Sequence, residues 1–271
     1  SIQAPVYPAQ ILSLTPRPDL VVLMNTTGPY SADELSDMTG IPVLVLKEGN
    51  LVEHREDLDY SLRVMGLVTG STDRALEVIR FFDKIVDNLH SRVSTIPEFQ
   101  YKTAYIGGYT RDTPRGILSS SPDYYPFDLV KVRNSLEGDY TIPQNSDAVL
   151  LTPSRIKKLK PDSIFIDLTS LEKKKNAIQE LEDYPEFSQT TAMKEGTVYG
   201  LYPTGIYGEN HEIDLINAYC IGKVLYPDKF IDVDPKIMAE YILTYLYGRS
   251  IYEDINKDIG VFALNRIPVF T

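Results

Sequence analysis

Apolar and polar residues follow the same order in two stretches of the chain, residues 11–23 (ILSLTPRPDLVVL) and 156–166 (IKKLKPDSIFI). Each has an amphipathic segment that ends in Leu, then a Pro-Asp pair, then a short apolar run. Proline ends a helix, because it lacks a backbone N–H and disfavours helix in the preceding residue. Short apolar runs are typical of buried strands. A helix–turn–strand unit that occurs twice predicts two similar α/β lobes.

Between these stretches, apolar residues recur with a period of 3.6 residues over a longer segment. This spacing predicts a helix over roughly residues 72–93. No glycine occurs from 71 to 106. About 20 helical residues span roughly 30 Å, enough to connect two lobes. The apolar positions of this helix fall on one stripe: Ala75, Val78, Ile79, Phe82, Ile85, Val86, Leu89 and Val93.

In the rest of the chain, predicted strands alternate with predicted helices, which favours parallel sheets built from βα units. The predicted class is α/β, with two lobes of central parallel sheets flanked by helices and joined by one long helix. The lobes are expected over 1–70 and 97–271, with the connecting helix at 71–96. The patterns predict strands at 19–24, 41–46, 102–108, 163–167 and 196–203, and helices at 8–14, 31–38, 170–184, 212–225 and 235–247.

Composition excludes several classes of partner. The formal charge of −11 argues against nucleic acid. The single cysteine, Cys220, excludes an internal disulfide, and its helical surroundings favour a buried thiol. No stretch reaches the ~18 apolar residues of a membrane span. No basic segment followed by an apolar one opens the chain, so we expect any signal peptide or anchor to have been removed.

Sequence motifs of catalysis are absent: there is no P-loop, GxGxxG, GxSxG or HExxH. His211 stands between Glu209 and Glu212, which reads either as a set of metal ligands or as a helix start with acids favoured by the helix dipole. The second interpretation is the simpler one. We therefore predict no metal site, no cofactor and no enzymatic activity.

One stretch carries a specific resemblance. Residues 222–235 read GK-x-L-x-P followed by F-x-D-x-D-P, and the next helix ends in Tyr247-Gly248. This resembles the substrate-binding proteins of ABC importers for ferric siderophores, haem and cobalamin. The phrases LSLTPRPDLV and LKPDSIFI are similar to the equivalent positions of the two lobes in that family.

The resemblance implies an extracytoplasmic protein that holds a metal chelate between its lobes and delivers it to the membrane subunits of an importer. A ligand sensor or scaffold of the same fold, and an α/β enzyme using the same cleft, remain as alternatives. Two departures matter. Only ten residues precede Ile11, so the first lobe is expected to be incomplete, with an open sheet edge that invites self-association. The family's docking glutamates correspond to Ala9 and Ser154.

Ligands of open α/β sheets bind beyond the carboxyl ends of the strands. Guanidinium groups and phenols in those loops suit a chelate with carboxylate, catecholate or phosphate groups. The predicted ligand-binding residues are Tyr30, Arg55, Tyr109, Arg111, Arg115, Thr169, Tyr202 and Tyr207, with Tyr109, Arg111 and Tyr207 foremost.

Overall fold

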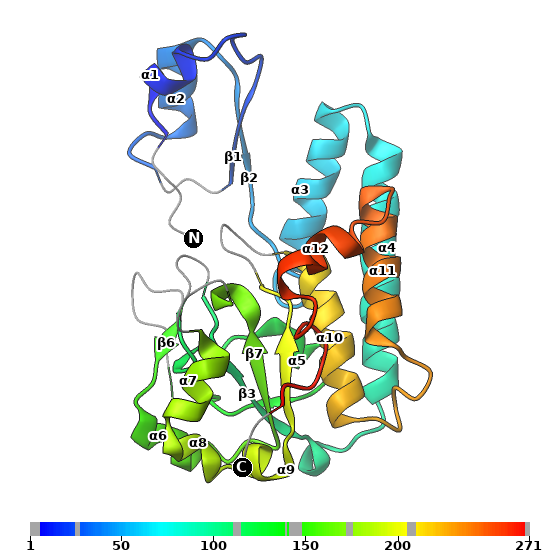
Figure 1. The fold of residues 1–271 in the computed structure, drawn as a ribbon. Coiled ribbons are helices and arrows are strands. Elements are labelled where there is room, and N and C mark those ends of the chain that lie inside the picture. The colour runs from blue at the N-terminus through cyan, green and yellow to red at the C-terminus, as the bar shows by residue number, and fades with distance from the viewer. Residues whose placement is uncertain are drawn as a thin grey trace. The chain divides into compact units, whose positions relative to one another are not determined.

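The computed structural model describes residues 6–24, 28–110, 115–138, 140, 148–171, 176–204 and 210–268. The chain divides into two compact units, Ser1–Phe82 and Asp83–Thr271. Parallel strands flanked by helices form the fold, which confirms the predicted α/β class (Figure 1). The finer division into 1–70, 71–96 and 97–271 stays a prediction.

The first unit opens with a small α/β layer. Its two strands pair in parallel, with Val21 opposite Val43 and Met24 opposite Leu46. Ile11, Leu35 and Ile41 form its buried centre. Among the described residues the sheet has only these two strands, and two strands alone are marginally stable. The elements are α1 (Pro8–Leu12), β1 (Val21–Met24), α2 (Ala32–Thr39) and β2 (Val43–Leu46).

Two long helices follow. The sequence did not predict α3 (Arg55–Val68), whereas α4 (Thr72–Val93) has the predicted bounds. The predicted stripe of α4 lies inward: six of its eight residues are buried, and Val78 and Val86 are half-buried. Gly66 of α3 lets the first turn of α4 approach, because a side-chain carbon there would meet the Ala75 methyl group.

The second unit is built on a four-stranded parallel sheet with the order β5-β3-β7-β8. Its central strand β7 is buried at every position, as expected for a parallel sheet with both faces covered. A separate antiparallel pair joins β4 (Ser119–Ser120) to β6 (Val149–Leu150). The sheet strands are β3 (Thr103–Gly107), β5 (Arg133–Asn134), β7 (Ser163–Asp167) and β8 (Val198–Leu201).

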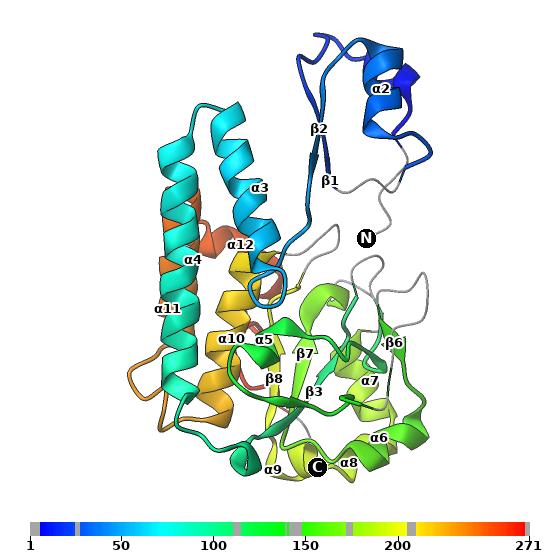
Figure 2. The same ribbon diagram turned by 180° about the vertical axis from the view of Figure 1, so that it is seen from behind.

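Helices cover both faces of this sheet (Figures 1 and 2). The group α6 to α8 lies on one side, and α10 with α5 lies on the other. Two short 3-10 helices are η1 (Glu98–Gln100) and η2 (Leu168–Ser170). The α-helices are α5 (Tyr125–Asp128), α6 (Pro153–Leu159), α7 (Ala177–Asp183), α8 (Pro185–Ser188), α9 (Thr191–Glu195), α10 (His211–Leu225), α11 (Pro235–Tyr247) and α12 (Tyr252–Ile259).

Both copies of the repeated phrase form the predicted helix–turn–strand unit. In the first unit α1 leads into β1, and in the second α6 leads into β7. The Asp162 side chain accepts a hydrogen bond from the Thr103 N–H at 2.8 Å, and its carbonyl accepts one from the Thr197 hydroxyl at 2.6 Å. The aspartate of the Pro-Asp pair therefore joins the starts of three neighbouring strands.

The predicted charged helix over 170–184 was too long. In the described residues α7 begins only at Ala177, because the Asn176 side chain accepts hydrogen bonds from the N–H groups of Ile178 and Gln179. Ser170 belongs to η2 instead, and residues 172–175 lie outside the described residues. Asn210 precedes α10 as predicted but caps it with its backbone carbonyl, without a side-chain cap bond.

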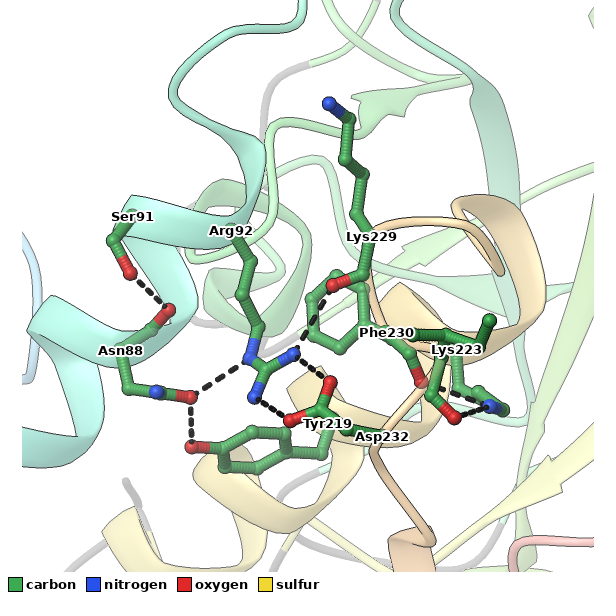
Figure 3. Close-up of polar contacts among 9 residues, drawn as sticks. Asn88, Ser91, Arg92, Tyr219, Lys223, Lys229, Phe230 and Asp232 are labelled. Atoms are coloured by element: carbon green, nitrogen blue, oxygen red, sulfur yellow. Dashed lines mark hydrogen bonds and ion pairs between the residues drawn. The ribbon is translucent and has the colours of Figure 1, made fainter.

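The stretch that carries the family resemblance contacts the end of α4 (Figure 3). We call the cluster of Asn88, Arg92, Tyr219, Phe230 and Asp232 the clip. The Arg92 guanidinium of α4 donates to both carboxylate oxygens of Asp232, at 2.6 and 2.8 Å, and lies over the Phe230 ring at 5.3 Å. Asn88 accepts hydrogen bonds from Arg92 Nε and from the Tyr219 hydroxyl, both at 2.9 Å. Helix α4 is thus tied to α10 and to the loop that follows it.

The remaining residues of the motif shape that loop. A side-chain carbon at Gly222 would collide with the Phe230 ring, so only glycine lets the loop fold back onto α10. The Lys223 ammonium donates to the carbonyls of Phe230 and Ile231, at 2.8 and 3.2 Å. Asp234 caps α11 through the Lys236 N–H, and Pro235 occupies its first turn. Gly248 ends α11 in the left-handed conformation, as predicted.

The clip predicts a pH-dependent stability. Hydrogen bonding by Arg92 lowers the pKa of Asp232 to about 2. A carboxyl with a depressed pKa stabilises the fold above its unfolded pKa of about 3.9, and this contribution is lost as the pH falls toward the folded value. We expect Asp232→Asn to lower the melting temperature at neutral pH, by an amount that shrinks between about pH 4 and pH 2.

Thermal unfolding of the wild type and the variant across this range measures the difference. Asp228→Asn is the matched control, because Asp228 is exposed in the same loop and has no hydrogen bond or ion pair among the described residues. A melting-temperature difference for Asp232→Asn that is the same at every pH would contradict the prediction.

Candidate functional site

The carboxyl ends of the parallel strands in the second unit bring a polar group of residues together. Tyr109 and Thr110 follow β3, Asp167 ends β7, and Tyr202 and Thr204 follow β8. In open α/β sheets this is the end where ligands bind. All five of these residues are buried, and Thr169, which follows Asp167 on η2, is half-buried.

Asp167 is the centre of the group and is completely buried. Its Oδ2 accepts hydrogen bonds from the N–H of Thr204 at 3.0 Å and from the Thr204 hydroxyl at 2.7 Å. Its Oδ1 accepts from the N–H of Thr169 at 2.9 Å and from the Thr169 hydroxyl. Both oxygens are therefore occupied, and the segments after β7 and β8 are held to each other. We call these three residues the Asp167 latch.

Burial raises the pKa of Asp167 above its ordinary value, and the hydrogen bonds from the two threonines oppose that rise. A buried carboxyl is tolerated only when its oxygens are hydrogen-bonded. The latch therefore holds the strand ends in place, and its oxygens are already committed to backbone and hydroxyl donors.

A row of aromatic rings lies beside the latch. The Tyr109 and Tyr124 rings meet edge to face with centroids 5.8 Å apart, and Tyr124 meets Phe127 in the same way at 4.9 Å. The Asn217 amide donates to the Tyr124 hydroxyl at 3.4 Å. Burial, reinforced by the charges of Asp167 and Asp214, raises the pKa of Tyr124 well above its ordinary value. Its phenol stays neutral and offers a hydrogen bond.

A small cavity opens between these rings and α10. Tyr109, Tyr124, Thr204, Asp123 and Asp214 contribute to its lining. Its volume of about 10 Å³ is the room that one water molecule needs. The cavity itself therefore has no room for a ligand larger than water.

Two of the predicted site residues belong to the first unit. Tyr30 packs on the core of the small sheet, and its ring meets Tyr7 edge to face at 6.2 Å. Arg55 was expected in a loop but opens α3. Its guanidinium donates to Asp59 at 2.7 Å and to the Ile79 carbonyl at 3.0 Å, and it lies over the Phe82 ring. These bonds tie α3 to α4.

The other predicted residues belong to the second unit. The structure brings Tyr109 and Thr169 to the carboxyl end of the sheet, as predicted. Tyr202 is also there, but its hydroxyl donates to Asn256 of α12 at 2.9 Å and its backbone pairs with the Asn217 side chain. Arg115 is half-buried just before β4. Arg111 and Tyr207 lie outside the described residues.

Sequence reasoning missed four residues of this group: Tyr124, Asp167, Thr204 and Asn217. One signal was available for Asp167, because the strand SIFID is apolar except for its two ends. An acid at the end of a buried strand is a candidate site residue. Asn217 gave no such signal, because it lies on a helix that is buried on nearly every side.

One prediction about a reactive group is confirmed. Cys220 is buried, as predicted, and desolvation raises the pKa of its thiol to about 12. Within the described ranges no three His, Cys, Asp or Glu side chains gather in a way that could hold a metal ion. In the same ranges there is no helix of the length and apolar character needed to cross a bilayer.

Structural comparison finds periplasmic binding proteins. A periplasmic solute binding protein of Veillonella parvula matches with a TM-score of 0.68 at 18% identity, covering 94% of this chain and 73% of that one. The molybdate periplasmic binding protein MolA of Haemophilus influenzae matches with a TM-score of 0.62 at 14% identity, covering 86% and 73%. The periplasmic haem binding protein HutB of Vibrio cholerae matches with a TM-score of 0.55 at 18% identity, covering 78% and 77%.

At these identities the structural matches establish the fold alone. No curated protein matches the sequence. The family model for periplasmic binding proteins matches residues 11–204, which span both copies of the repeated phrase, the long helix and the Asp167 latch. The chain therefore belongs to the periplasmic binding protein family.

Proposed function

We propose that this chain is an extracytoplasmic solute-binding protein that captures a metal chelate, a ferric siderophore, haem or a corrinoid, and delivers it to an ABC importer without chemical turnover. Family membership supports solute binding, and the sequence resemblance at 217–248 supports the chelate class. Among the structural relatives, HutB binds haem and MolA binds molybdate.

The Asp167 latch is the observation that carries the proposal. It fixes the ends of β7 and β8 to each other at the end of the sheet where ligands bind in such folds. The Asp167 oxygens are already taken up by Thr169 and Thr204, so this buried acid is not placed as a general base. Neutral phenols and fixed hydroxyls suit binding of a bulky ligand better than proton transfer to it.

A second candidate function is a sensor or scaffold that does not dock on an importer. Ala9 and Ser154 are both exposed and both occupy the second residue of a helix that begins with proline, α1 and α6. This equivalence supports the alignment that places the family's docking glutamates there. Neither residue carries a charge, and neighbouring Arg155 donates to the Tyr140 hydroxyl at 2.6 Å. Docking, if it occurs, uses other residues.

Two binding experiments test the ligand class and the loops after β3 and β8. A thermal-shift screen against ferric siderophores, haem, cobalamin and oxyanions should identify a ligand that adds about 2.7 kcal/mol of stability at 100 times its Kd. Replacing Arg111 by Ala and Tyr207 by Phe together should weaken that ligand more than tenfold, or more than about 1.4 kcal/mol.

The matched control is the pair Arg63→Ala and Tyr60→Phe, an exposed arginine and an exposed tyrosine of α3. This pair should leave the affinity unchanged. Equal affinity of the Arg111/Tyr207 variant and the wild type would place the site elsewhere, and a screen without any stabilising chelate would reject the ligand class.

Another prediction concerns the Asp167 latch. Thr204→Val keeps the shape of the side chain but removes the hydroxyl that donates to buried Asp167 at 2.7 Å. Leaving a buried acceptor with one donor fewer should cost about 1–3 kcal/mol of unfolding free energy, measured by urea denaturation. Thr204→Ser retains the hydroxyl and should cost clearly less; equal losses for Val and Ser would show that packing, and not the hydrogen bond, matters at this position.

We also propose that the first unit self-associates. Its two-stranded sheet has no further strand among the described residues, and Val22 is 41% exposed on β1. Unpaired strand edges are templates for pairing with another chain. Sedimentation of the chain over a wide concentration range should show a reversible dimer that Val22→Lys weakens. A monomer at every concentration would contradict this proposal.

A further inference from the structure

A groove lies at the opposite end of the second unit's sheet from the latch. It has a volume of about 500 Å³, within the usual range for small-molecule sites. Asp162 and Lys102, which immediately precede β7 and β3, form part of it. Five strand residues at about 3.3 Å each separate the two ends of the sheet by roughly 16 Å. The groove is therefore separate from the candidate site.

Hydrogen bonds hold the floor of the groove in place. The Tyr226 hydroxyl accepts from the Lys102 N–H and donates to the Lys131 carbonyl, both at 2.9 Å. Asp162 is held by the Thr103 N–H. On the rim, the Lys229 ammonium donates to the Thr95 hydroxyl at 3.0 Å, which leaves two of its N–H bonds for other partners. A floor fixed in this way needs little ordering when a ligand binds.

Aromatic rings form the apolar walls. Phe99 of η1 is 81% exposed, so most of its apolar surface is left in water. Tyr101 and Tyr226 line the same groove. Phe99 is exposed, Tyr101 is half-buried and Tyr226 is buried. Aromatic rings around one hollow suit a flat ligand, since stacked or edge-to-face rings attract each other beyond their buried area.

The charges around the rings favour an anion. Lys102 and Lys229 line the groove, and Lys131 and Arg133 lie over the Tyr101 ring at 5.8 and 5.9 Å. The Lys102 ammonium has no hydrogen bond or ion pair with any residue that the structure describes. Against these four cations stand three acids: Asp162, which accepts from the Thr103 N–H, Asp228, and Glu98, which pairs with Arg133 at 3.5 Å. The lining itself has two lysines and two aspartates, and the neighbouring Lys131, Arg133 and Glu98 add one net positive charge, on a chain whose net charge is −11.

From this combination we propose that the groove binds a planar aromatic anion, an aromatic carboxylate being the simplest. The ring lies between Phe99 and the tyrosines, and the carboxylate lies toward the ammonium groups of Lys102 and Lys229. The site is independent of the chelate site at the other end of the strands, so both ligands can be bound at once.

Calorimetric titration of the whole chain with 2-naphthoate tests the proposal, with 2-naphthamide and 2-naphthylmethylamine as the neutral and cationic counterparts. The carboxylate should bind at least tenfold more tightly than the amine. Replacing Phe99 and Lys102 together by Ala should weaken naphthoate more than tenfold. Both side chains are exposed, so the fold should be retained, and affinity for the chelate should not change.

The matched control replaces Lys236 and Ile237 by Ala, an exposed lysine and an exposed apolar residue of α11 outside the groove. It should bind naphthoate like the wild type. Three results would overturn the proposal: no saturable binding at millimolar naphthoate, binding of the amine as tight as that of the carboxylate, or equal affinity in the Phe99/Lys102 variant and the wild type.

Discussion

The bidentate pair between Arg92 and Asp232 is the contact on which the helical side of the second unit depends. An exposed ion pair contributes little, and Asp232 is 64% exposed. Arg92, however, is only 17% exposed, lies over the Phe230 ring, and shares Asn88 with the Tyr219 hydroxyl. The planar guanidinium thus holds a carboxylate, a ring and an amide in one arrangement, which a lysine could not do. It fixes the loop from which α11 starts.

This contact shows that much of the most recognisable phrase of the sequence, residues 222–235, has a structural role. Gly222 makes room for Phe230, Lys223 holds two carbonyls of the loop, and Asp234 caps α11. Asp232 binds Arg92, and Pro235 occupies the first turn of α11. The phrase therefore fixes the loop between α10 and α11 and the start of α11.

Periodicity sufficed for the elements that bury a regular stripe. The bounds of α4 and α11 follow from apolar spacing, from the absence of glycine in one and from Pro235 and Gly248 in the other. Strands of two residues, such as β4 to β6, are too short to show any period. Helix α3 was missed because its apolar stripe is weak and only three of its residues are buried.

For the site, the strand-end rule found Tyr109 and Thr169 because it depends only on where a strand stops. It could not show what each side chain does there. Arg55 is bonded to a carbonyl 24 residues away, and Tyr202 to a side chain 54 residues away. Asp167 and Thr204, separated by 37 residues, form the latch. Contacts at such distances in the sequence follow from the folded topology, and a single sequence does not display them.

The two ends of the second unit's sheet differ in charge, and this difference constrains the proposed ligand site. At the carboxyl end, the charged residues that line or adjoin the described cavity are acids: Asp123, Asp167 and Asp214. An anionic chelate cannot be held by these acids and by neutral phenols alone. We predict that its positive partners are Arg111 and Arg115, which the sequence places between β3 and β4.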